Sequence, residues 1–95
     1  MTKQEFELLI DYLKGDDYKP AKHIINDIPY INDDKKLRKM VNGLRKQGHP
    51  IISCNRGYKY STNKIEIINC IIDLRGRANQ ILQACDGLQD YINGN

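Results

Sequence analysis

The chain alternates between stretches in which apolar residues recur every three or four positions and short stretches rich in glycine, proline and aspartate. This recurrence places apolar side chains on one face of an α-helix. Residues 3–14, 21–28, 32–48 and 63–93 show it, so we expect four helices. The apolar residues expected to face the core in the first three are Phe6, Leu9, Ile10, Leu13, Ala21, Ile24, Ile25, Ile28, Leu37, Met40, Val41 and Leu44.

Residues with special backbone preferences mark where these helices begin and end. Gly15 and the aspartates after it end the first helix, and Pro20 suits the first turn of the second. Pro29 stops that second helix. Asn32 can accept a hydrogen bond from the free amides at the start of the third helix. Gly48 can adopt the left-handed conformation that ends it.

Residues 50–54 and 58–60 are short β-prone runs around Asn55-Arg56-Gly57, which predicts a β-hairpin with an arginine at its tip. The tight connection 29–32 joins the second and third helices into a helix-turn-helix, with Ile31 pointing inward. We therefore predict a mostly α fold with a small β-hairpin. Its parts are a winged helix-turn-helix domain over residues 1–61 and a long C-terminal helix over residues 62–95.

The positive charge of the chain is concentrated in its centre. The formal net charge is +3, but residues 33–60 hold eight Lys and Arg against two Asp and Glu. Steps of about 100° per residue place most of these cations on the side of the third helix opposite its apolar residues. Such a patch is typical of a surface that binds a polyanion, and a solvated lysine-rich helix face is its ordinary alternative.

The segment LRKMVNGLRKQGHPIISCNRGYKYS resembles the recognition helix and wing of winged-helix regulators of the biotin-operon-repressor type. Their pattern is a helix L-R-x-x-V-x-x-L-R-x-x-G, then P-I-I-S and a wing containing R-G-Y. The chain is also similar to short winged-helix proteins of bacteriophages and mobile elements, whose C-terminal helix carries an R-x-R-A-like segment, here residues 75–78. The resemblance covers residues 3–61 as a fold and is specific over residues 37–60.

The resemblance implies DNA binding, with the third helix in the major groove and the wing near the backbone or minor groove. The major-groove positions are Lys35, Lys36, Lys39 and Asn42, and the wing positions are Arg56 and Lys59. The charge pattern adds Arg38, Arg45 and Lys46 to the expected DNA contacts.

Asp33 and Asp34 depart from this pattern, because they place negative charge at the start of the basic helix. They can interact favourably with the positive end of the helix dipole, which contributes about 0.3–1 kcal/mol each at an exposed site. They can also accept a hydrogen bond from cytosine N4 in the major groove. We favour the first interpretation.

Apolar residues in the last stretch alternate steps of four and three, which forms a heptad seam. We name this set the seam: Ile67, Ile71, Leu74, Ala78, Ile81, Cys85, Leu88 and Ile92. It predicts a homodimer through a coiled coil. Ile68, Ile72 and Leu82 widen the apolar face, so packing against the first helix is the alternative. Gly76 and Gly87 could bend or break the helix.

Nothing in the sequence indicates catalysis. The chain has no phosphate-binding loop, no dinucleotide-binding glycine motif and no H-E-x-x-H. Neither His23 nor His49 lies near a nucleophile or carboxylate that would complete a catalytic set. The three cysteines lack a C-x-x-C pair, so we expect buried thiols and neither a metal nor a cofactor. Tyr58 and Tyr60 could stack on bases, but we favour a place in the core beneath the wing.

No apolar run approaches the roughly 20 residues that span a bilayer, and the first residues do not form the apolar core of a signal peptide. We therefore expect a soluble protein of the bacterial cytoplasm or nucleoid. The leading prediction for its function is double-stranded DNA binding in transcription regulation or replication, for example in a phage or mobile element. The alternative is a protein-interaction module that inhibits or adapts a host nucleic-acid or defence machine.

Overall fold

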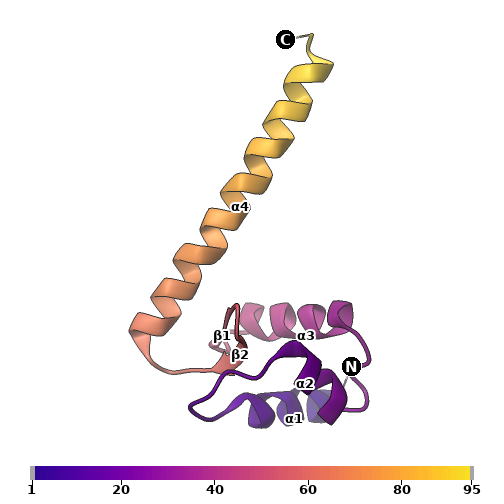
Figure 1. Ribbon diagram of the computed structural model, residues 1–95, viewed down its shortest axis with the longest axis vertical. Helices are drawn as coiled ribbons and strands as arrows, with labels where there is room; N and C mark the ends of the chain where they lie inside the picture. The colour runs from indigo at the N-terminus through magenta and orange to yellow at the C-terminus, as the bar shows by residue number, and fades with distance from the viewer. Residues whose placement is uncertain (1, 95) are drawn as a thin grey trace.

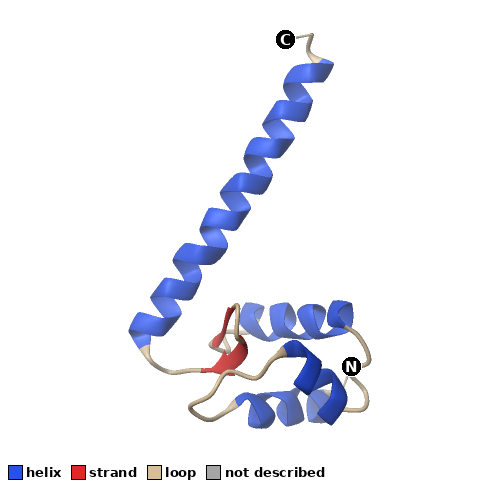
Figure 2. Ribbon diagram, viewed as in Figure 1, coloured by secondary structure: helices blue, strands red, loops and turns tan. Residues whose placement is uncertain are grey.

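The computed structural model describes residues 2–94. Its elements, in chain order, are α1 (Lys3–Leu13), α2 (Ala21–Asp27), α3 (Asp34–Lys46), β1 (Ile51–Cys54), β2 (Gly57–Tyr60) and α4 (Lys64–Ile92). Figure 1 shows α1, α2, α3 and the hairpin gathered at one end and α4 rising away from them. The predicted fold class is confirmed: a mostly α chain with a small antiparallel hairpin and a long C-terminal helix (Figure 2).

The core lies where the apolar faces of the first three helices meet. Each helix contributes residues at the predicted spacing, and the connection before α3 contributes Ile31. Burying one such side chain stabilises the fold by about 1.5–3 kcal/mol. The buried cluster is Leu9, Leu13, Ile24, Ile28, Ile31, Leu37, Met40, Val41, Leu44 and Ile51, and Tyr58 and Tyr60 pack against it as expected.

The first turn of α3 is capped one residue later than the sequence suggested. Asp33, not Asn32, is the N-cap, and its Oδ1 accepts a hydrogen bond of 2.8 Å from the Lys36 amide. A carboxylate in this place also interacts with the helix dipole, which favours it over the neutral amide of asparagine. At the other end, Gly48 has a φ of +94°, which confirms the predicted left-handed stop.

A third segment of the chain pairs with the hairpin beside its two strands. Ile51 pairs with Tyr60 and Ser53 with Tyr58 in the β1–β2 register. On the outer side of β2, the Lys19 amide donates to the Tyr58 carbonyl at 2.8 Å, and the Tyr58 amide donates to the Lys19 carbonyl at 2.9 Å. The connection between α1 and α2 thus adds a third, one-residue strand segment. It ties the start of the helix-turn-helix to the hairpin.

The long helix α4 is continuous through Gly76 and Gly87. Its first turns pack against β1, where Cys70 is buried with its Sγ 4.0 Å from the Ser53 carbonyl oxygen. Every residue from 75 to 92 is exposed, so the alternative prediction, packing of the long helix against α1, is wrong for this part. The expectation of buried thiols is also wrong for Cys85, because nothing in residues 2–94 covers that part of α4.

Candidate nucleic-acid interface

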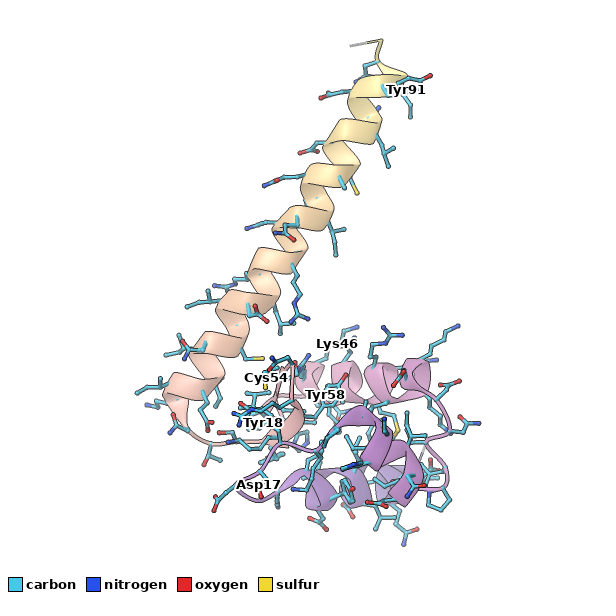
Figure 3. The ribbon with its side chains drawn as sticks, in the orientation of Figure 1. Asp17, Tyr18, Lys46, Cys54, Tyr58 and Tyr91 are labelled. Carbon is cyan, nitrogen blue, oxygen red and sulfur yellow. The ribbon has the colours of Figure 1, made fainter. Side chains whose placement is uncertain are left out.

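The face of α3 opposite the core is cationic. Burial of Leu37, Met40, Val41 and Leu44 fixes the rotation of the helix and turns its other side outward. The exposed residues on that side are Lys35, Arg38, Lys39, Asn42 and Lys46. Figure 3 shows Lys46 on the outer edge of the domain, on the side away from α1. We name these five residues the α3 face.

The α3 face is accessible at its N-terminal half. In Figure 1, α3 runs from its start at the far side of the domain towards the hairpin, and α4 leaves from the hairpin end. Lys35, Arg38 and Lys39 therefore lie at the end of α3 that is remote from α4.

Arg56 lies at the tip of the hairpin and is exposed, as the sequence predicted. Its Cζ is 4.9 Å from the centroid of the Tyr18 ring, which is a cation–π distance. Its backbone amide also lies 3.3 Å from Cys54 Sγ. The tyrosine comes from the segment that pairs with β2, so the third strand segment also positions the wing arginine. The sequence offered no sign of this contact, because residues 16–20 read as a simple loop.

Arg45 is not part of the exposed cationic surface. Its Nε donates to the Ile51 carbonyl at 2.7 Å, and its Nη2 donates to Ser53 Oγ at 3.0 Å. These bonds join the last turn of α3 to β1, so the prediction that Arg45 is a free phosphate contact needs correction. Lys36 is half-buried, with its Nζ 6.0 Å from the centroid of the Tyr30 ring, and lies at the edge of the α3 face.

Lys59 is also placed differently from the expectation that it contacts DNA from the wing. It is buried, and its Nζ forms an ion pair of 2.8 Å with Glu66 Oε2 at the start of α4. Ser61 Oγ donates to the other oxygen of Glu66 at 2.8 Å. The hydrogen bond between Lys59 and Glu66 raises the pKa of Lys59 and lowers the pKa of Glu66, and Ser61 lowers the Glu66 pKa further. The pair anchors α4 to the hairpin.

This ion pair predicts a specific acid sensitivity. Because the pKa of Glu66 is lowered in the folded state, the unfolded chain binds a proton first as the pH falls below the ordinary value of 4.5. The stability that Glu66 contributes above that pH is then lost as the pH falls through its lowered folded pKa. We expect Glu66→Gln to be less stable than the wild type at pH 7. The difference should shrink as the pH falls below about 4.5 and through the lowered folded-state pKa of Glu66. Urea unfolding at several pH values measures this, and a difference that is constant with pH would contradict it.

The two aspartates at the start of α3 differ in their surroundings. Asp33 uses its carboxylate as the N-cap, which agrees with the structural interpretation that we favoured. Asp34 lies exposed in the first turn. Both carboxylates are exposed at the N-terminal end of the α3 face. Because Asp33 already accepts the capping hydrogen bond, the alternative interpretation, a hydrogen bond from cytosine N4, suits Asp34 better.

Within residues 2–94, no group of three His, Cys, Asp or Glu side chains is arranged to hold a metal ion. None of the helices in that range combines the length and apolar character needed to cross a bilayer. His23 is exposed, and His49 lies with its ring 6.2 Å from that of Tyr60.

A helix-turn-helix whose second helix carries an antiparallel hairpin at its end defines the winged helix-turn-helix class of fold. Comparisons with protein-family models, with curated proteins and with solved structures found no match for this chain. The structural class therefore follows from the geometry of the chain itself.

Proposed function

We propose that this protein binds double-stranded DNA, with α3 in the major groove and the hairpin beside it. The observation that carries the proposal is the composition of α3 after its first turn. From residue 35 to residue 46 the helix has six cations and no carboxylate. Four of these cations belong to the exposed α3 face: Lys35, Arg38, Lys39 and Lys46.

The dimensions of α3 suit this role. Its 13 residues make a rod about 20 Å long, and the major groove, about 12 Å wide, admits a single helix. Lysine and arginine can reach phosphates or guanine, and the side-chain amide of Asn42 can form hydrogen bonds with adenine. These groups lie on one side of one rigid helix, which is held from behind by the buried core.

The wing supplies a second point of contact. Arg56 is exposed at the hairpin tip beyond the C-terminal end of α3, where it can reach the backbone or minor groove flanking the helix. Arg45 and Lys59 support this arrangement from within, because one fixes α3 to β1 and the other fixes the hairpin to α4. The proposed DNA contacts are Lys35, Lys36, Arg38, Lys39, Asn42, Lys46 and Arg56.

The salt dependence of binding tests the proposal. A subunit that neutralises about three phosphates should give a slope of log affinity against log salt near −3, and two subunits should give about −5. Fluorescence anisotropy of a mixed-sequence 25-base-pair duplex, titrated at four salt concentrations, measures the slope. A slope near zero would overturn the proposal. The biological setting that we propose is transcription regulation or replication for a phage or mobile element, in the bacterial cytoplasm or nucleoid.

A second candidate function comes from the other end of the molecule. The exposed apolar residues of α4 would suit a winged-helix module that binds a host protein and inhibits or adapts it. Apolar contacts persist in high salt, whereas phosphate contacts do not. A stoichiometric partner that remains bound at 1 M NaCl, together with no DNA binding at low salt, would favour this function.

A further inference from the structure

The seam of α4 does not lie on the side of the helix that faces the domain. Glu66, Cys70, Asp73 and Arg77 line a groove against the hairpin, which identifies the side of α4 that faces its own domain. At about 100° per residue, the centre of the seam lies about 80° around the helix from that side. The domain therefore leaves most of the seam open: Ile67 and Leu74 are half-buried, and the other apolar seam residues are exposed.

The open seam is strongly apolar over the distal half of α4. Ile81 is 65% exposed, Leu88 71% and Ile92 76%. Figure 3 shows Tyr91 at the far end of α4, well away from the labelled residues of the domain. Isolated exposed apolar residues are common, but a contiguous row at heptad spacing is typical of a helix that pairs with another helix.

We propose that a second copy of this chain covers the seam, and that the two α4 helices run antiparallel about a two-fold axis between Asn79 and Gln80. In this arrangement the seam pairs with itself over its whole length. Isologous symmetry makes Ala78 of each copy contact Ile81 of the other, and Cys85 contact Leu74. Such pairing involves α4 alone and is independent of DNA binding.

The sizes of the seam residues favour the antiparallel direction. In a parallel dimer each layer pairs identical residues, so alanine would meet alanine and cysteine would meet cysteine. Ala78 and Cys85 would then form two thin layers, which lose packing contacts and leave voids. The antiparallel direction sets each of these small side chains against an isoleucine or leucine, so no layer consists of two small side chains.

The assembly state is tested first. Sedimentation equilibrium of the full chain at 100 µM should give a dimer. Leu88→Lys should give a folded monomer, because the variant places a charge within the paired seam, opposite Ile71 of the other copy. Gln83→Lys, an exposed substitution on the opposite side of α4, is the matched control and should remain dimeric. A monomeric wild type, or a dimer that Leu88→Lys leaves unchanged, would overturn the proposal.

Disulfide trapping then tests the direction. Antiparallel pairing holds the two Cys85 residues about 16 Å apart along the axis, so oxidation of the wild type should not link them. Leu74→Cys should yield a covalent dimer, and Leu74→Cys with Cys85→Ser should not. Peptide mapping under non-reducing conditions identifies the 74–85 link. A wild type that links through Cys85, or a double variant that links through position 74, would show parallel pairing and overturn the antiparallel assignment.

Discussion

Gly57→Ala is expected to destabilise the domain by about 3 kcal/mol or more. Gly57 has a φ of +125°, and a Cβ built on it would lie 2.1 Å from the Lys19 carbonyl oxygen. The left-handed conformation costs about 1–2 kcal/mol, and forced overpacking adds about 1–3 kcal/mol. The neighbouring atoms belong to backbone that is hydrogen-bonded to β2, so they cannot move without loss of the third strand segment. Thermal unfolding should show a fall in Tm of more than about 12 °C.

Gly48→Ala is the matched control for this prediction. Gly48 also has a left-handed φ, of +94°, but nothing lies within 4 Å of a Cβ built there. The control should therefore carry only the conformational cost, about 1–2 kcal/mol. Equal losses of stability in the two variants would show that the approach of Lys19 to the wing does not constrain position 57.

The double charge reversal Lys35→Glu with Lys39→Glu is expected to weaken duplex binding by at least about 100-fold at 0.1 M salt. Both lysines are exposed on the α3 face and take no part in the core, so the fold should be retained. The salt slope should also fall by about one unit for each lost phosphate contact. Fluorescence anisotropy measures both quantities, and circular dichroism checks the fold.

Lys3→Glu with Lys64→Glu provides a variant of the same net charge. Both residues are exposed at the starts of helices outside the proposed interface, where a carboxylate also suits the helix dipole. This variant should bind within about threefold of the wild type, since long-range charge is screened over about 10 Å at 0.1 M salt. An equal loss of affinity in the two variants would show that binding depends on the net charge of the protein and not on the α3 face.

Much of the fold could be predicted because the apolar spacing that indicates each helix also identifies the side chains that meet in the core. The apolar spacing of α1, α2 and α3 identified the residues that form the core, and Gly48 marked the end of α3. The position of the α3 N-cap was missed by one residue, since both Asn32 and Asp33 can accept the capping hydrogen bond. The third strand segment was missed because one residue, Lys19, carries no periodic pattern.

The candidate interface was only partly predictable for a different reason. Sequence spacing places a cation on the outer side of a helix or strand, but it does not say which cations find partners after folding. Arg45 and Lys59 were expected to contact DNA, and both are instead bonded to groups from other elements. Those partners are carbonyl, hydroxyl and carboxylate groups whose positions depend on how the hairpin meets α3 and α4. Lys35, Arg38 and Lys39 have no such bonded partner within residues 2–94, and they lie exposed as predicted.

The central claim is that the α3 face and the hairpin tip form the surface that binds duplex DNA. Chemical-shift mapping of backbone amides, during titration of ¹⁵N-labelled protein with a 25-base-pair duplex, tests it most directly. The largest changes should fall in residues 34–46 and 55–57, and residues 75–92 should change little. Changes confined to α4, or no changes at low salt, would contradict the claim.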